Sequence, residues 1–368
     1  MIGHFLRGTL PAWYVLAISL CATALAWYFT QSATTHDAQD RFEAQIGVVQ
    51  VDLSDRLRAY EQVLRGAAST FYSWPSVTRE NWRRYVENLH IAENYLGVQG
   101  IGFAQVVSPA EKEAHQRQIQ SEGFPSYAIW PEGERAIYTA IVYLEPFDGG
   151  NRRALGYDMF SEPVRRAAME RARDTGQASL SGKVALVQGT DEVLQAGLLM
   201  YLPLYRTDSA AEVEDRRRQL IGYVYSTFRM GDFMRALLGA KRRNVAVEVF
   251  DGEKTVADAL MYSTLTRDGN RTRTMAPFVE TVRLNLNGAT WTLRFSALPS
   301  IWLDRGKPLI VAGAGVLISV LLAAIAWSLA KKRIQPASAN ERLQSDFAKR
   351  EQIEVQPSQQ EASFRYLF

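Results

Sequence analysis

The stretch IYTAIVYLEPFDGGNRRALGYDMFSEPVRRAAMERARDTG, residues 137–176, decides the fold class of this 368-residue chain. Its apolar beginning predicts a strand over 137–144. A strong helix signal follows, with Ser161 as N-cap, Pro163 in the first turn and Gly176 just past the end. A strand followed by a helix indicates a domain that mixes α and β structure.

The segments on both sides of this stretch continue the mixed pattern. Residues 78–92 predict an amphipathic helix capped by Thr78, residues 109–120 predict a charged surface helix, and the polar segment 207–218 predicts a loop or hairpin tip. Strands are predicted at 98–107, 127–130, 180–187, 197–205 and 220–228, and a smaller sheet is predicted from 245–250, 279–286 and 290–297. The fold class is therefore α+β.

Two uncharged apolar blocks lie near the ends of the chain. One covers about residues 10–30 and the other covers 308–330, and each has the roughly 20 residues that a membrane-spanning helix needs. The cluster Lys331, Lys332 and Arg333 after the second block predicts a cytoplasmic flank, so both termini are expected inside and the middle of the chain outside. A cleaved signal peptide is the alternative for the first block, because Ala24 and Ala26 form an A-x-A pattern.

A long apolar stripe follows the first block. Apolar residues recur every three or four positions from Phe42 to Phe71, which predicts a helix over about 36–72 that ends at Trp74 and Pro75. Its length favours a stalk, assigned here to residues 31–75, that pairs with a second copy of the chain as in a coiled coil. The alternative is that the stripe packs only on the chain's own domain.

Composition limits the classes of function. The only cysteine, Cys21, lies in the first apolar block, so the exported part has no intramolecular disulfide, and the net charge of +3 implies no nucleic-acid partner. The four histidines are scattered, so we expect no metal and no cofactor. No hydrolase, metalloprotease or phosphate-loop motif occurs. Two of the carboxylates of Glu145, Asp148, Asp158 and Glu162 could form the acid and base pair of a glycosidase. The alternative is that these residues form turns, helix caps and salt bridges.

An ordered set of short motifs resembles the CHASE domain family, the extracytoplasmic input module of bacterial and plant receptors. The resembling elements, in order, are GIGFAQVV at 100–107, YLEP at 143–146, Asn151-Arg152, GYDM at 156–159, RARDTG at 171–176, LSG at 180–182, LLMYLPLY at 198–205 and GYVYSTF with Arg229 at 222–229. The resemblance implies a stalk helix followed by two PAS-like α/β subdomains, the distal one (76–240) binding a small ligand and the proximal one covering 241–306.

A small planar or amphipathic ligand needs an apolar wall with a few fixed polar groups. Six residues of the predicted central strands and the turn beside them are candidates: Tyr143, Leu199 and Tyr201 for the wall, and Glu145, Asp148 and Arg152 for orienting the ligand. The alternatives are ordinary sheet core for the aromatic residues and a cap or salt bridge for the charged ones. Two departures at the positions that bind cytokinin in plant members, Gly149 and Tyr201, argue against cytokinin itself.

These observations predict a membrane-bound sensor in the inner membrane, dimeric through its stalk and spans. Residues 1–9 would be a cytoplasmic N-terminus, and 331–368 a polar cytoplasmic connector in which Pro336 and Pro357 interrupt any continuous helix. The terminal SFRYLF is similar to the start of a PAS domain, so a histidine kinase or diguanylate cyclase output would lie in a longer receptor. A tethered periplasmic enzyme and an envelope scaffold are the alternatives.

Overall fold

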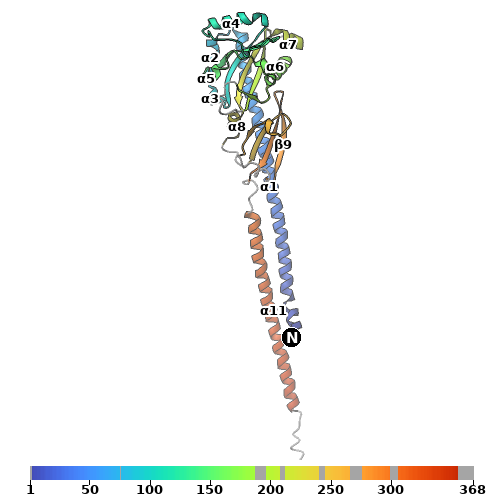
Figure 1. Cartoon of the computed structure of the whole chain (residues 1–368). Helices are drawn as coiled ribbons and strands as arrows, with labels where there is room; N and C mark the ends of the chain where they lie inside the picture. The colour runs from blue at the N-terminus through green and yellow to red at the C-terminus, as the bar shows by residue number, and fades with distance from the viewer. Residues whose placement is uncertain are drawn as a thin grey trace, which may run out of the picture. The chain divides into compact units, whose positions relative to one another are not determined.

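The computed structural model describes residues 2–74, 76–186, 196–207, 212–239, 245–265, 276–298 and 306–354 (Figure 1). The chain divides into two compact units: residues 39–302, and a second unit made of residues 1–38 and 303–368. The 39–302 unit contains two antiparallel sheets and the helices that cover them. The fold is therefore α+β, as the sequence predicts.

The larger sheet has the strand order β2-β1-β6-β5-β3, with β4 paired to β5 as well. Its strands are β1 (Val98–Val107), β2 (Tyr138–Glu145), β3 (Ser179–Leu180), β4 (Val184–Ala185), β5 (Ala196–Tyr205) and β6 (Leu220–Arg229). All neighbouring pairs are antiparallel. Four of these strands match the predicted ones closely, whereas the predicted strand at 180–187 is two short strands, with residue 187 outside the described residues.

Helices cover both faces of this sheet. Helix α6 (Pro163–Thr175) lies against one face, where its buried residues Ala168, Met169 and Ala172 join the sheet's core. Helices α1 (Ile2–Ser73) and α2 (Arg79–Asn88) lie against the other face, where Phe71 and Trp82 pack together and Phe71 also contacts Phe103 of β1. The sheet is therefore the middle layer of three.

The smaller sheet has the strand order β8-β7-β10-β9, formed by β7 (Val245–Asp251), β8 (Leu260–Ser263), β9 (Val279–Leu286) and β10 (Ala289–Ala297). Two hydrogen bonds donated by backbone N–H groups join it to the β3–β4 segment of the larger sheet. Leu180 N donates to Asn287 O at 2.9 Å, and Lys183 N donates to Asp251 Oδ2 at 2.8 Å. The short elements are α3 (Ile91–Asn94), η1 (Pro109–Glu111), α4 (Lys112–Ser121), α5 (Gly149–Arg152), η2 (Met159–Ser161), α7 (Val213–Gln219), α8 (Met230–Leu238) and η3 (Ala257–Ala259).

Helix α1 carries the predicted apolar stripe, and this stripe is buried within its own chain. Tyr60 stacks on Phe228 of β6 with ring centroids 5.4 Å apart, and Phe42 lies 6.0 Å from Phe278 beside β9. This packing on the chain's own domain is the alternative that the sequence left open for the stripe, and pairing with a second copy stays a prediction. The helix ends at Ser73, as predicted.

Among the described residues, two helices are long and apolar enough to cross a membrane. The candidate spans lie within Leu10–Ser73 of α1 and at Gly306–Ala330 of α11 (Gly306–Glu354). In the 1–38 and 303–368 unit, Thr23 Oγ1 lies 3.5 Å from Ser319 Oγ. Because α11 continues past Pro336, the prediction that this proline interrupts the helix is wrong, whereas Pro357 and SFRYLF lie outside the described residues.

Three local predictions are also wrong. Residues 127–130 form only an isolated bridge between Trp130 and Tyr157. The N-cap of α6 is Glu162, whose carboxylate accepts hydrogen bonds from two backbone N–H groups, so Ser161 does not fill that role. The predicted loop at 207–218 contains helix α7, which Arg217 ties to Asp174 of α6.

Candidate functional site

Three buried tyrosines share the sheet face that α6 covers. Tyr201 of β5 lies opposite Tyr225 of β6, and Pro203 lies opposite Tyr223, so the alternation of the strands places all three rings on one side. Each tyrosine is fully buried, and the ring centroid of Tyr201 lies 6.2 Å from that of Tyr223 and 6.3 Å from that of Tyr225. We call Tyr201, Tyr223 and Tyr225 the tyrosine cluster.

The three hydroxyl groups of the tyrosine cluster make no hydrogen bond to any residue that the structure describes. The same holds for Oγ1 of Thr227, which lies opposite Leu199 on this face. A buried hydroxyl without a partner costs about 1 to 3 kcal/mol, and native proteins keep few of them. The sheet face that carries several of them is therefore the candidate ligand site.

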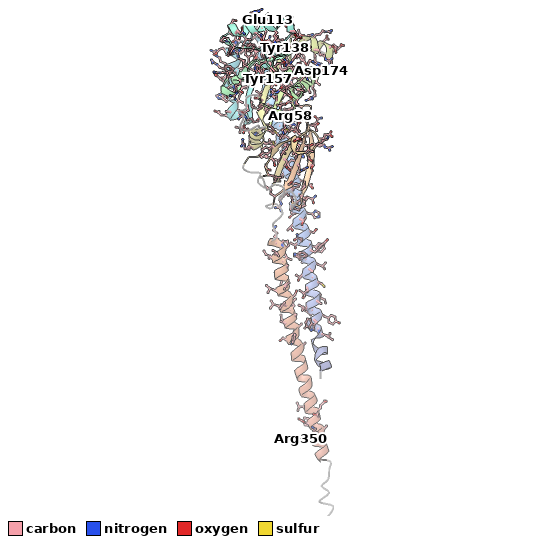
Figure 2. All side chains as sticks on the ribbon, viewed as in Figure 1. Arg58, Glu113, Tyr138, Tyr157, Asp174 and Arg350 are labelled. Carbon is pink, nitrogen blue, oxygen red and sulfur yellow. The ribbon has the colours of Figure 1, made fainter. Side chains whose placement is uncertain are left out.

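One buried guanidinium belongs to the same face. Arg165 of α6 is only 3% exposed, donates from Nη2 to Ala185 O at 2.8 Å, and lies over the Tyr157 ring at 5.0 Å (Figure 2 labels Tyr157). Burial raises the pKa of Tyr201 and of Tyr225, and the nearby positive charge of Arg165 only partly opposes this effect. The hydroxyls therefore remain protonated and act as neutral donors or acceptors.

Asp158, in the GYDM motif, is the buried carboxylate at the far edge of this layer. Its Oδ1 accepts hydrogen bonds from the backbone N and the hydroxyl of Thr139 and from Phe160 N, at 2.8 to 3.2 Å. Its Oδ2 lies 3.4 Å from Arg135 Nη1 and has no hydrogen-bond partner among the described residues. Asp158 thus holds the chain turn beside β2 through Oδ1 and forms an ion pair with Arg135 through Oδ2.

Gly102 in β1 makes room for the Tyr225 ring. A methyl group at this position would lie 2.5 Å from Tyr225 Oη and 2.5 Å from Tyr143 O, closer than real side chains approach. Packing against Tyr225 therefore explains why residue 102 is a glycine. It lets Tyr225 lie flat across the sheet and direct its hydroxyl over β1.

The arrangement fits recognition of a small molecule by neutral hydroxyls and one guanidinium, within walls such as Leu199 and Phe160. Among the residues that the structure describes, no group of three or more His, Cys, Asp or Glu side chains could hold a metal ion.

Comparison with known proteins identifies the family of the domain that holds these residues. Residues 75–262, about half of the chain, match the CHASE domain family. The chain belongs to the CHASE domain family. It therefore carries a CHASE sensory domain. The chain is also 23% identical, over 290 residues, to hybrid signal transduction histidine kinase A of Dictyostelium discoideum, covering 73% of this chain but 13% of that protein.

Two solved structures resemble this CHASE chain. An extracellular ligand-binding receptor from Desulfohalobium retbaense has a TM-score of 0.43 at 13% identity, over 70% of this chain and 40% of that one. The periplasmic sensory domain of a Campylobacter jejuni chemoreceptor has a TM-score of 0.37 at 9% identity, over 75% of this chain and 98% of that one. TM-scores this low do not establish a shared fold.

The CHASE sheet does not bring the six predicted ligand residues together. Leu199 and Tyr201 lie on the face with the tyrosine cluster. Tyr143 lies on the opposite face, where it stacks on Trp82 and donates from its hydroxyl to Val77 O at 2.8 Å. Of the six predicted residues, the structure therefore places only Leu199 and Tyr201 beside the tyrosine cluster.

The other three predicted residues have local structural contacts. Glu145 is buried at the end of β2, its Oε2 accepts from Phe147 N at 2.8 Å, and burial raises its pKa. Asp148 caps α5 by accepting from Asn151 N, and Arg152 lies over the Phe147 ring at 5.3 Å. Asp148 therefore caps a helix, which was the alternative to its ligand role. A ligand role for any of these three residues stays a prediction.

Arg165, Tyr223 and Tyr225 are the members that the sequence interpretation missed. The alternation Tyr223, Val224, Tyr225 next to Tyr201 in the neighbouring strand was the available signal, since period-two residues share a face. Arg165 gave no signal, because a helical arginine is usually exposed.

Proposed function

We propose that the exterior of this receptor binds a small molecule at the tyrosine cluster and transmits the event to a cytoplasmic output domain. The observation that carries the proposal is the set of buried hydroxyls of Tyr201, Tyr223 and Tyr225 without partners among the described residues. Membership of the CHASE family supports a sensory role for the domain that holds them.

The chemistry of the cluster limits the ligand. Protonated hydroxyls and the Arg165 guanidinium favour a molecule with acceptor oxygens or nitrogens, such as a carboxylate or an amide. The rings of Tyr157 and Phe160 and the side chain of Leu199 favour a flat or apolar remainder. The ligand class is therefore a small amphipathic molecule with at least one acceptor group.

The β3–β4 segment, residues 179–185, is the route by which α6 would pass the signal on. Arg171 of α6 donates to Ser179 Oγ at 2.9 Å and to Leu180 O at 2.8 Å. The same segment is bound to the smaller sheet through Lys183, which donates from its backbone N to Asp251 and from Nζ to Asp258 O and Leu260 O. A shift of α6 on ligand binding would thus displace the smaller sheet.

The wider architecture belongs to the same proposal. Residues 76–240 and 241–306 would be the distal and proximal PAS-like subdomains after the stalk of residues 31–75. Residues 10–30 and 308–330 would cross the inner membrane, with 1–9 and 331–368 in the cytoplasm. The chain would act as a dimer, and a histidine kinase or diguanylate cyclase would provide the output, which the distant likeness to a hybrid histidine kinase supports.

A thermal-shift screen of the full chain in detergent micelles against a library of small carboxylates and amides tests the proposal. We expect at least one compound to raise the melting temperature of the wild type, and Tyr201→Phe to reduce that shift. A matched control is Tyr127→Phe. The Tyr127 hydroxyl lies 2.8 Å from His115 Nε2, to which it is hydrogen-bonded, and it does not belong to the tyrosine cluster. A compound whose shift survives Tyr201→Phe and Tyr225→Phe unchanged would refute this location.

A further inference from the structure

A second candidate site lies at the end of the larger sheet where β1 and β5 finish and β6 begins. A cavity of about 480 Å³ lies there beside helix α4, and its volume is in the range of small-molecule pockets. Its walls include Val107 of β1, His115 of α4, Arg206 after β5 and Leu220 of β6. No member of the tyrosine cluster lines it, so the two sites are separate.

Two groups of opposite charge line this cavity. Among the thirteen described residues of its walls, Glu111 and Arg206 are the ones whose side chains are charged at neutral pH. His115 is the other titratable residue, and burial lowers its pKa below the usual 6.5, so its ring is neutral at pH 7. The cavity therefore presents one positive and one negative charge.

The guanidinium of Arg206 is open to a ligand. Its backbone N donates to Gln219 O at 2.8 Å, and the preceding Tyr205 pairs with Leu220, so the residue's backbone is fixed where β5 and β6 meet. Its side chain makes no hydrogen bond and no ion pair with any residue that the structure describes. Its positive charge is therefore not neutralised by a bonded partner.

Glu111 is held in place but keeps its charge. Its Oε2 accepts hydrogen bonds from Ser108 N at 3.3 Å and from Ser108 Oγ at 2.6 Å, whereas its Oε1 makes none with the described part of the chain. The hydrogen bonds from Ser108 and, to a smaller degree, the charge of Arg206 lower the pKa of this carboxyl, so it is ionised at neutral pH. Because Ser108 is neutral, the negative charge remains available to a ligand.

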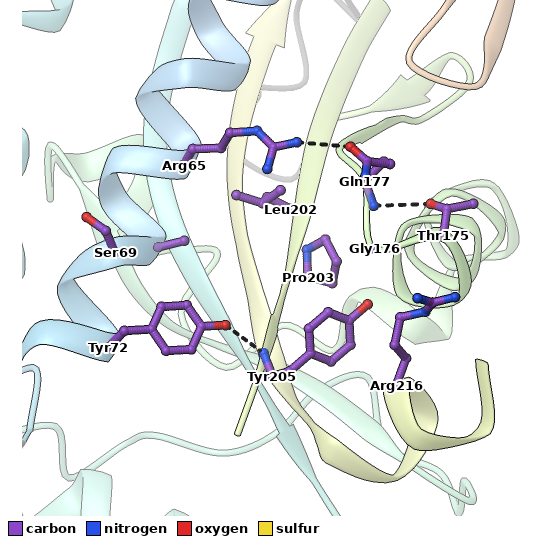
Figure 3. Close-up of a pocket in the computed structure, with 11 residues that line it drawn as sticks. Arg65, Ser69, Tyr72, Thr175, Gly176, Gln177, Leu202, Pro203, Tyr205 and Arg216 are labelled. Carbon is purple, nitrogen blue, oxygen red and sulfur yellow. Dashed lines mark hydrogen bonds between the residues drawn. The ribbon is translucent and has the colours of Figure 1, made fainter. Parts of the chain in front are cut away.

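A different cavity, of about 380 Å³ between α1, β5 and α6, lacks this property at its arginine on α1 (Figure 3). There Arg65 donates from both Nε and Nη2 to Glu61 Oε1, and from Nη2 to Gln177 Oε1 at 3.1 Å. The charge of Arg65 is therefore already paired, in contrast to that of Arg206.

We propose that the cavity beside α4 binds a small zwitterion, that is, a short amino acid, with its carboxylate on Arg206 and its ammonium group on Glu111. Each end would make a charge-assisted hydrogen bond. A molecule with a single charge would bind only one of the two groups and would be repelled by the other. The carbon chain would lie against Val106, Ile137 and Leu220. This site does not depend on the function proposed for the tyrosine cluster.

Isothermal titration of the full chain in micelles with glycine, β-alanine and 4-aminobutyrate tests this site. We expect at least one of these amino acids to bind saturably. Its affinity should exceed by about tenfold or more that of the carboxylate and the amine that each lack one charged group, such as butyrate and propylamine for 4-aminobutyrate. Arg206→Gln should weaken binding of the amino acid by a similar factor.

Glu111→Gln is the second variant, because a glutamine oxygen can still accept the hydrogen bonds from Ser108. It should weaken binding of the amino acid but strengthen binding of the carboxylate analogue, since the repelling charge is gone, and misfolding would not produce this opposite pair of effects. The matched controls are Arg117→Gln and Glu113→Gln, because these two residues of α4 pair with each other at 3.5 Å and do not line the cavity.

Both controls and Tyr201→Phe should keep the wild-type affinity for the amino acid. Three results overturn the proposal: no saturable binding of any of the three amino acids to the wild type, equal binding of the amino acid and its carboxylate analogue, or binding that Arg206→Gln and Glu111→Gln leave unchanged.

Discussion

Replacing Tyr225 by phenylalanine removes a hydroxyl that has no hydrogen-bond partner among the described residues. An unsatisfied buried hydroxyl costs about 1 to 3 kcal/mol, so Tyr225→Phe should raise the free energy of unfolding of the ligand-free protein by about 1 kcal/mol or more. The control is the same change at Tyr127, which is 4% exposed and whose hydroxyl lies 2.8 Å from His115 Nε2. Tyr127→Phe should lower the free energy of unfolding by about 1 kcal/mol or more, because it leaves a buried histidine nitrogen unpaired.

Equilibrium unfolding in urea, followed by circular dichroism of the full chain in one detergent, measures both effects. Each variant lacks one hydroxyl oxygen of the wild type. The test therefore depends on whether the free energy of unfolding rises or falls in each variant. We expect their free energies of unfolding to differ by about 2 kcal/mol or more. If Tyr225→Phe destabilises the protein as much as Tyr127→Phe does, the Tyr225 hydroxyl has a partner and the reasoning about the cluster is wrong.

Three further predictions concern the same unit. Gly102→Ala places a methyl group 2.5 Å from Tyr225 Oη and should lower the free energy of unfolding by about 1 to 3 kcal/mol in urea titrations, and an unchanged midpoint would contradict this packing. Burial lowers the pKa of His115 below its usual 6.5, so the unfolded chain binds the proton more readily. Stability should therefore fall as the pH drops below about 6.5, and unfolding midpoints between pH 5 and 7.5 should lose this slope in His115→Gln. Asp251→Ala removes the acceptor for Lys183 N, so amide hydrogen exchange should speed up in residues 179–185, and unchanged exchange would show that this bond does not hold the segment.

The strands and the main helix of the larger sheet could be predicted because their signals are local. Strand β1 matches its predicted bounds, and α6 begins at Pro163 and ends before Gly176, whose φ of 71° places it in the left-handed region that glycine favours. Helix α7 could not be predicted in the same way, because its sequence after Val213 is polar. Part of its stability comes from the contact of Arg217 with Asp174, a residue 43 positions earlier.

The candidate site was only partly predictable, for a reason of geometry. Shifting by one residue along a strand moves a side chain to the other face of the sheet. Tyr143 and Tyr201 are both aromatic residues in strands of the larger sheet, yet one packs under α2 and the other under α6. The face of each strand depends on register and on the bulge between Phe103 and Ala104, which no local pattern reveals.

Native mass spectrometry of the full chain released from micelles tests the ligand-binding claim most directly. With a compound that stabilises the wild type, we predict one bound copy per chain in the wild type and in Tyr127→Phe, and none in the double variant Tyr201→Phe with Tyr225→Phe. Equal retention of the compound by the double variant and the wild type would contradict the assignment of the tyrosine cluster as the ligand site.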